Sequence, residues 1–327
     1  MKKYRFKSLI IPIAAAMLCL ALISISIAPI AVSVDPPPSV PALKNEGERI
    51  TLLVGGTDRS SGLTDVLMLV TVRTDTGHAC VLQIPRDTYA AYTEKSYKKI
   101  NGAYGALGGE GLSRLLSESL NVKIDGYVII SPDTLRRAVD ALGGVEVELD
   151  RNMYYNDPAQ GLYINLKAGR QTLNGEKAEQ FIRYRSGYAN GDLGRMDTQK
   201  IFLVAAARKL KAHTSGVELL RLSASLMSGT DTNITPARAM AVIEALKSGE
   251  DRDTVLLTAP GESATAKSGA SYYSLSAPAM AEVLKKYFDG DGQFDSKKLF
   301  LNKNNGTFGK IYGSYSAYNT VTADKVN

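Results

Sequence analysis

Two aspartates stand beside neighbouring apolar runs, where two strands of one sheet would meet. The run 50–55 is followed by Asp58, and Asp65 directly precedes the next run, 66–72. Carboxylates at the mouths of adjacent strands can share one hard cation, because Mg²⁺ usually takes one or two carboxylates together with phosphate oxygens and water. We therefore predict a metal site at Asp58 and Asp65. Aspartate is also common in turns and caps, so both residues have an ordinary structural alternative.

An arginine follows a third apolar run. The run 79–84 leads into Pro85, Arg86 and Asp87. Proline cannot continue a central strand, so we expect the chain to turn there and to present Arg86. A surface ion pair between Arg86 and Asp87 is the alternative.

The densest group of polar residues lies further along the chain. Arg183 and Arg185 would share a face in an extended segment, but would lie about 200° apart in a helix. Arg195 and Gln199 are one helical turn apart, near a predicted helix N-terminus that favours phosphate. Several guanidinium groups converging on one place suit a diphosphate better than a carboxylate. The alternative is an exposed basic helix whose arginines pair with nearby acids, Asp192 and Asp197.

The charge of the chain excludes nucleic-acid binding. Four of the 39 Lys and Arg residues lie among the first seven residues, which leaves 35 against 33 Asp and Glu in the rest. A nearly neutral body lacks the electrostatic footprint of a nucleic-acid-binding protein, so we predict no nucleic-acid partner.

The few cysteines and histidines exclude two further classes of site. Cys19 and Cys80 form no disulfide framework, and we expect Cys80 to be a small buried hydrophobic residue. His78 and His213 have no partners at ligand spacing. Zinc chemistry and a Ser-His-Asp triad are therefore excluded from the prediction.

The N-terminal segment predicts the compartment. A basic stub, 1–8, precedes an uncharged apolar segment, 9–34. This segment exceeds the roughly 20 residues that span a bilayer and the about 7–15 of a signal-peptide core. We predict an uncleaved transmembrane helix at 9–34, with cleavage near Ala31 or Ser33 as the alternative. Positive charge stays inside, so the remainder would lie outside the cell membrane on a proline-rich linker, 35–48.

Strand-like and helix-like segments alternate after the linker. The first three strands, 50–55, 66–72 and 79–84, are apolar enough to be covered on both faces. Further patterns predict helices at 112–120, 132–142, 175–182, 194–211, 219–227, 236–246 and 277–288, and strands at 127–130, 145–149 and 254–257. This alternation predicts a layered α/β domain over 49–288. The segment 289–327, rich in Gly, Asn, Ser and Tyr, is predicted to be a flexible tail.

The order of these residues resembles the LytR-CpsA-Psr family over about residues 50–210. The matching pieces are Gly56-Thr57-Asp58, Asp65, Ile84-Pro85-Arg86-Asp87-Thr88, Lys99-Ile100-Asn101, 139–145, 173–178, Arg183-Tyr184-Arg185, Asp192-Leu193-Gly194-Arg195 and Gln199. Each piece is weak alone, and the ordered series carries the resemblance. One departure is Thr198, because the family often has a second arginine directly before the glutamine. That change would lower the affinity for phosphate or reflect a different glycan.

The resemblance implies a single α-β-α layered domain with a mixed central sheet, a motif core at 50–212 and a deep apolar groove for a polyprenyl chain. It implies a metal-dependent phosphotransferase that moves a glycopolymer, such as teichoic acid or capsule, from a polyprenyl-pyrophosphate carrier to peptidoglycan, in a Gram-positive type of envelope. Asp58 and Asp65 would hold Mg²⁺ or Mn²⁺ and would be catalytic together with Arg86. The pyrophosphate would be bound by Arg86, Arg183, Arg185, Arg195 and Gln199.

Two other functions stay open at this point. The same site could split polyprenyl pyrophosphates with water as the acceptor. The chain could also bind lipid-linked glycan, or regulate, without catalysis. The short stub argues against direct gene control, and the set of acids and arginines argues against an inactive site. The sequence does not identify the general base, although Asp58 is a candidate.

Overall fold

The computed structural model describes most of the chain from Gly47 onward. The described residues are 47–58, 62–92, 98–158, 161–188, 192–213, 229–249, 253–266, 268–293, 299, 308–311 and 320–322. The predicted stub, the predicted transmembrane helix and nearly all of the predicted linker lie outside them, as does the predicted helix at 219–227. Within the described ranges, no helix is long and apolar enough to cross a membrane.

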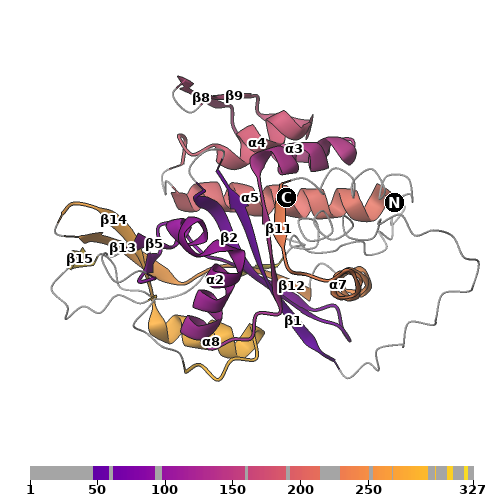
Figure 1. The fold of residues 1–327 in the computed structure, drawn as a ribbon. Coiled ribbons are helices and arrows are strands. Elements are labelled where there is room, and N and C mark those ends of the chain that lie inside the picture. The colour runs from indigo at the N-terminus through magenta and orange to yellow at the C-terminus, as the bar shows by residue number, and fades with distance from the viewer. Residues whose placement is uncertain are drawn as a thin grey trace, which may run out of the picture.

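One mixed sheet forms the centre of the fold (Figure 1). Its strands are, in spatial order, β11 (Thr230–Thr232), β6 (Gly126–Ile130), β1 (Arg49–Thr57), β2 (Thr64–Arg73), β3 (Ala79–Gln83), β12 (Thr254–Thr258) and β16 (Thr320–Thr322). β1 runs parallel to β6, and β3 runs parallel to β12. The other neighbours are antiparallel. The predicted mixed central sheet is thus confirmed.

Helices cover both faces of this sheet, as Figure 1 shows for α3, α4 and α5 on one side and α2 and α8 on the other. The first group is α3 (Pro132–Ala141), α4 (Gly175–Arg183), α5 (Asp192–His213) and α7 (Pro236–Ser248), and the second is α2 (Ala103–Leu120), which follows η2 (Ile100–Gly102), and α8 (Ala277–Tyr287). Leu52 and Val54 of β1 face the first group, whereas Leu53 faces the second, since successive strand side chains point to opposite faces.

Four small sheets surround this core. They are β4 (Tyr89–Ala90) with β5 (Lys98–Lys99), β7 (Val145–Leu149) with β10 (Gly169–Leu173), β8 (Met153–Asp157) with β9 (Leu162–Leu166), and β14 (Ser271–Leu275) with β13 (Gly261–Ala266) and β15 (Phe308–Ile311). The β8–β9 hairpin lies beside α4, at the top of Figure 1.

Two expectations need correction. The helix predicted at 112–120 begins nine residues earlier, at Ala103, because a glycine-rich stretch hides its apolar period, and it kinks at Gly108, where φ is 69°. The segment predicted to be a flexible tail supplies β15 and β16, which pair with β13 and β12. The partners of these strands come from distant parts of the chain, so local composition gave no sign of them. Cys80 is 2% exposed, as expected, and burial raises the pKa of its thiol.

Helix α4 is fixed closely against both of its neighbours. Asn174 caps it by accepting a hydrogen bond from the backbone N–H of Lys177 at 3.0 Å. A Cβ at Gly175 would lie 2.2 Å from the carbonyl oxygen of Arg136 in α3, so only glycine allows this approach. On the other side, the rings of Phe181 and Phe202 lie 6.4 Å apart and join α4 to α5.

Replacing Phe181 by alanine should destabilise the domain strongly. The side chain is 1% exposed in the core, and phenylalanine-to-alanine changes in cores typically cost about 3–5 kcal/mol of unfolding free energy. Denaturant unfolding of the two chains, followed by circular dichroism, measures the difference. Leu107→Ala, at a side chain that is 39% exposed, is the control and should change stability by no more than about 0.5 kcal/mol. Equal effects of the two variants would contradict this account of the α4–α5 contact.

Candidate functional site

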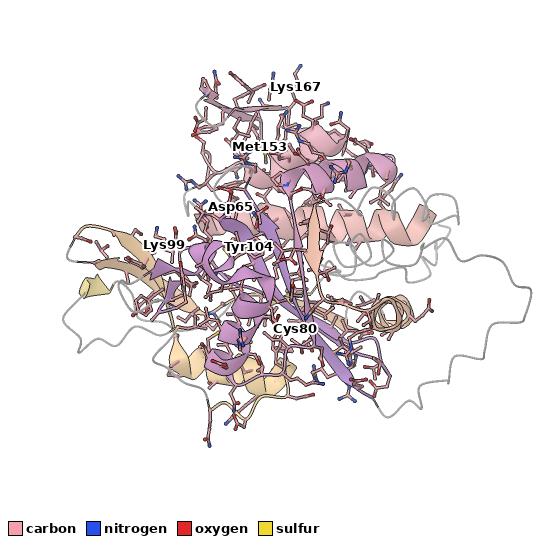
Figure 2. The ribbon with its side chains drawn as sticks, in the orientation of Figure 1. Asp65, Cys80, Lys99, Tyr104, Met153 and Lys167 are labelled. Carbon is pink, nitrogen blue, oxygen red and sulfur yellow. The ribbon has the colours of Figure 1, made fainter. Side chains whose placement is uncertain are left out.

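Asp65 sits at an irregularity between β1 and β2. Gly56 pairs with Val66 while Thr57 pairs with Thr64, so Asp65 is the extra residue on its strand. Such an insertion bends the strand and redirects a side chain, and it is frequent beside functional sites. Figure 2 shows Asp65 at the end of the sheet that faces α4 and the β8–β9 hairpin.

Asp58 lies directly after β1. Its backbone N–H donates to the carbonyl oxygen of Leu63 at 2.8 Å, which draws the two ends of the β1–β2 connection together. Asp58 and Asp65 therefore line the same cavity, as the sequence predicted for the mouths of two adjacent strands.

Arg86 lies in the turn that follows β3. The backbone N–H of Thr88 donates to the carbonyl oxygen of Pro85, closing the expected turn. Nη1 of Arg86 donates to Oδ1 of Asp65 at 2.6 Å, and its Nε lies 3.3 Å from Oδ1 of Asp192 in an ion pair. Burial disfavours the charged guanidinium, but the attraction of Asp192 and Asp65 outweighs it and raises the pKa of Arg86. The alternative pairing with Asp87 is not observed; Asp87 pairs with Lys99 at 2.8 Å.

Arg195 is buried near the start of α5, with 4% of its surface exposed. Its Nε and Nη2 donate to the two carboxylate oxygens of Asp192, at 3.1 and 3.2 Å, and Nη2 also donates to the carbonyl oxygen of Asp65 at 3.2 Å. Asp192 thus contacts two arginines that come from different elements, Arg86 after β3 and Arg195 on α5.

Arg183 and Arg185 fit neither of the two simple geometries considered from the sequence. Arg183 is the last residue of α4, and Tyr184 is extended, with φ −61° and ψ 130°. Nη1 of Arg183 donates to Oε1 of Glu179 at 3.0 Å. Arg185 lies beyond the helix end and is exposed. The helix end brings both side chains to one pocket despite the change of backbone conformation.

Gln199 uses its amide inside the protein. Its Oε1 accepts from Nε2 of Gln83 at 2.6 Å, and its Nε2 donates to the carbonyl oxygen of Ile182 at 3.2 Å. The residue is 2% exposed and lines the same cavity as Asp58 and Asp65. These two hydrogen bonds position α5 against β3. The second amide N–H of Gln199 makes neither bond and is left for a ligand.

Two connected pockets meet at these residues. The arginine pocket has a volume of about 250 Å³ and is lined by Asp65, Arg86, Tyr155, Leu162, Arg183, Arg185, Ser186 and Arg195. The second pocket is an apolar cleft between the sheet and α3, α4 and α5, and it is the cavity that Asp58, Asp65 and Gln199 line. This apolar cleft shares Asp65, Arg183 and Arg195 with the arginine pocket. The other walls of the cleft are mainly apolar, with Val66, Ile130, Leu135, Ile182, Phe202 and Leu203.

The apolar cleft is narrower than the groove expected from the family resemblance. It encloses about 60 Å³, whereas sites for drug-sized ligands hold about 300–1,000 Å³. Its walls have the chemistry for a hydrocarbon chain, but they lie close together in this structure.

The donor set at Asp58 and Asp65 fits a divalent cation that also binds phosphate. Asp65 uses Oδ1 for Arg86, and within the described part of the chain its Oδ2 has no hydrogen-bond partner. No group of three or more His, Cys, Asp or Glu among the described residues could hold a metal alone. Two carboxylates completed by phosphate oxygens and water match the habit of Mg²⁺.

The structure adds Glu179, Tyr155 and Gln83 to the site, which the sequence did not single out, and it gives Asp192, already considered as a partner of nearby arginines, a further contact with Arg86. Asp192 and Glu179 supply counter-charges, Tyr155 lines the arginine pocket, and Gln83 holds Gln199. Thr198, the departure from the family pattern, is 3% exposed and bonds to the hydroxyl of Tyr188 rather than facing either pocket. The i,i+3 spacing of Asp192 and Arg195 was the only sequence signal among these.

Because Asp192 contacts two arginines, substituting it should lower the free energy of unfolding more than substituting another aspartate of α5. Asp192→Asn leaves buried Arg195 without its charged partner and should lower the free energy of unfolding by about 1–3 kcal/mol. The control is Asp197→Asn, because Asp197 is 67% exposed and pairs at the surface with Lys200; it should change stability by about 0.5 kcal/mol or less. Denaturant unfolding measures both, and an equal effect would show that Asp192 is an ordinary surface partner.

Comparison with known proteins identifies the family of the chain. The model of the LytR_cpsA_psr family matches residues 30–289. A relative from Oceanobacillus iheyensis, the polyisoprenyl-teichoic acid–peptidoglycan teichoic acid transferase TagU, is 31% identical over 182 residues, which are 53% of this chain and 55% of that protein. This chain spans only 39–55% of the length of three such curated relatives.

Solved structures agree with the fold. The crystal structure of TagV from B. subtilis has a TM-score of 0.64 at 24% identity, covering 74% of this chain and 96% of that one. The structure of TagT bound to LI-WTA has a TM-score of 0.58 at 25% identity, covering 73% of this chain and 88% of that one. The family match spans most of the chain and includes every residue of the two pockets, so this protein belongs to the LytR-CpsA-Psr family.

Proposed function

We propose that this protein is a membrane-anchored phosphotransferase that moves a glycopolymer from a polyprenyl-pyrophosphate carrier to peptidoglycan. The observation that carries the proposal is the junction of the two pockets, where four arginines and Asp65 meet an apolar cleft. A polyprenyl pyrophosphate needs both surfaces at once, because its head is highly charged and its tail is hydrocarbon. The names of the relatives, which describe transfer of teichoic acid to peptidoglycan, support this substrate class.

The donor would bind with its pyrophosphate in the arginine pocket. Guanidinium forks pair well with phosphate oxygens, and Arg86, Arg183, Arg185 and Arg195 supply them from three separate parts of the chain. The prenyl tail would enter the apolar cleft. Since that cleft encloses about 60 Å³, its walls must move apart to admit a chain of several isoprene units.

The reaction is a displacement at phosphorus. An oxygen of a peptidoglycan sugar hydroxyl forms a bond to the phosphorus that carries the glycan. The bond from that phosphorus to the bridging oxygen breaks, and polyprenyl phosphate leaves with the electron pair. The hydroxyl proton passes to a carboxylate, for which Asp58 is our candidate. The arginines stabilise the charge that develops on the leaving oxygen, which is the main protein contribution in phosphoryl transfer.

A divalent cation, Mg²⁺ or Mn²⁺, completes the proposed site at Asp58 and Asp65. When bound, it would neutralise phosphate charge and polarise a phosphoryl oxygen. We further propose that the segment 9–34 anchors the protein in the cell membrane, with the described domain outside the cytoplasm. The length and lack of charge of that segment support this localisation.

The transferase proposal predicts that Arg86 is indispensable. We expect the full-length chain in detergent, given a short polyprenyl-pyrophosphate glycan, peptidoglycan fragments and Mg²⁺, to place glycan on peptidoglycan. Arg86→Ala should lower the rate by about 10²–10³-fold, the usual effect of losing one preorganised donor to a developing oxyanion. Arg170→Ala, at an exposed pair with Glu146 on β7, is the matched control and should keep the parent rate. Circular dichroism checks that both variants fold.

Other outcomes of the same assay are informative. Normal transfer by Arg86→Ala would remove this residue from the site. Release of glycan phosphate with and without peptidoglycan, and no transfer, would make the protein a hydrolase. Tight binding of the lipid-linked glycan without any turnover would make it a binding protein.

Metal removal gives a separate prediction. A chelator should abolish transfer, and added Mg²⁺ should restore it. Asp58→Asn and Asp65→Asn should each weaken Mn²⁺ binding, measured by electron paramagnetic resonance in the presence of a pyrophosphate. Asp197→Asn, an exposed carboxylate on α5, should leave Mn²⁺ binding unchanged. Transfer that persists in full after chelation would rule out the metal while leaving the arginine site intact.

A further inference from the structure

A buried carboxylate, Glu179 of α4, stands in the wall of the mainly apolar cleft. The residue is 2% exposed. Ile182 and Arg183 follow it three and four positions later, so the three side chains share one face of the helix, and all three line the cleft. Arg183 also lines the arginine pocket, whereas the described lining of that pocket does not include Glu179. Glu179 therefore contacts one of the pocket's four arginines from the side of the apolar cleft.

Two arginines from different helices share this carboxylate. Nη1 of Arg183 donates to Oε1 of Glu179 at 3.0 Å, and Nε of Arg136 on α3 donates to Oε2. The side chain of Arg136 is 38% exposed, and among the described residues that line the two pockets Arg136 is absent. The ion pairs thus run from the surface of α3, through a buried carboxylate, to a guanidinium at the proposed reaction site. We call these three residues the Arg136–Glu179–Arg183 relay.

The backbone holds the two helices of the relay together independently of these charges. α3 and α4 lie side by side (Figure 1). A Cβ at Gly175 would lie 2.2 Å from the carbonyl oxygen of Arg136, and the backbone N–H of Gly175 donates to Oδ1 of Asp140 on α3 at 2.7 Å. A change of charge within the relay should therefore act on the side chain of Arg183 more than on the packing of the helices.

We propose that Glu179 and Arg136 are positioning residues that set the affinity of Arg183 for the pyrophosphate. The carboxylate of Glu179 and a phosphate group compete for the same guanidinium, so Glu179 weakens the hold of Arg183 on the donor and on the departing phosphate. Arg136 competes with Arg183 for Glu179, and so restores part of that hold. The proposal rests on the proposed function, because it deepens the donor subsite of that reaction.

The ordinary alternative is a salt bridge that only links α3 to α4. A buried ion pair is weak evidence for stability, because apolar side chains of similar size often replace such pairs at no cost. An apolar residue would also suit the wall of a cleft for hydrocarbon better than a carboxylate does. The two accounts differ in sign. A simple link predicts weaker phosphate binding whenever either Arg136 or Glu179 is changed, whereas competition predicts opposite effects of the two changes.

Binding of methylenediphosphonate, a non-hydrolysable analogue of pyrophosphate, tests the relay without turnover. The full-length chain in detergent is titrated calorimetrically at fixed Mg²⁺ and salt. Glu179→Gln should bind about tenfold more tightly than the parent and Arg136→Gln about tenfold more weakly, a size typical of coupling within one ion-pair network. Arg136→Lys keeps the charge and should restore parent affinity. Glu146→Gln, at an exposed pair with Arg170, is the matched control and should bind like the parent.

The double variant Arg136→Gln/Glu179→Gln tests whether Arg136 acts through Glu179. Once the carboxylate charge is gone, loss of Arg136 should have no further effect, so the double variant should bind as tightly as Glu179→Gln alone. A direct long-range effect of each charge would make the two changes additive and return the double variant to parent affinity. Circular dichroism checks the fold, and Glu179→Leu, which suits the apolar wall, takes the place of Glu179→Gln if that variant does not fold.

The remaining outcomes separate this proposal from the proposed function. Weaker binding in both single variants, or additive effects in the double variant, overturns the relay, even where transfer is normal. In the transfer assay Glu179→Gln should lower the KM for the donor without raising kcat. If the opposite binding shifts occur but glycan is never transferred, the relay stands and the transferase proposal fails. If the parent binds neither the diphosphonate nor the lipid-linked glycan, both proposals fail.

Discussion

Guanidinium groups gathered around one small pocket repel one another, and the site depends on how that repulsion is balanced. At about 4 Å, two like charges near a protein surface cost on the order of 4 kcal/mol. The structure places a carboxylate against three of the arginines: Arg86 contacts Asp65, Arg195 contacts Asp192, and Arg183 contacts Glu179. The Arg183 and Arg195 pairs each lie within one helix, α4 and α5. Arg86 is the residue whose ion pairs join separate elements, because it contacts Asp65 of β2 and Asp192 of α5.

This balance explains why the site can be both stable and receptive to an anion. A diphosphate that enters the pocket meets guanidinium groups already held in place, so little conformational entropy is lost on binding. Asp192 contacts two arginines through its two oxygens, much as one phosphate group would. The carboxylate and the incoming phosphate would compete for the same forks, which sets a limit on affinity and eases release of the product.

The sequence predicted the central strands well, because their apolar runs are nearly continuous and turn residues bound them. It also predicted which strand ends carry the polar residues, and those ends do meet around the two pockets. It could not predict Asp192 as a shared partner, because Arg86 and Asp192 are brought together only by the sheet and α5. The sequence did not predict the β8–β9 hairpin, for another reason. Its alternation of buried and exposed residues is interrupted by Tyr155, which faces the pocket side yet is 40% exposed.

Two surfaces of different chemistry lie next to one another in this fold: an apolar cleft and a pocket of arginines. Each surface would bind the wrong part of a substrate weakly. Hydrocarbon gains nothing from guanidinium groups, and a phosphate loses its hydration in an apolar cleft. Their order along the molecule therefore selects an order of chemical groups in whatever binds across them. A lipid tail followed by a pyrophosphate satisfies both surfaces together. The cleft encloses less space than the arginine pocket, so separation of the walls of the cleft is the step that would decide when a substrate with both groups can enter.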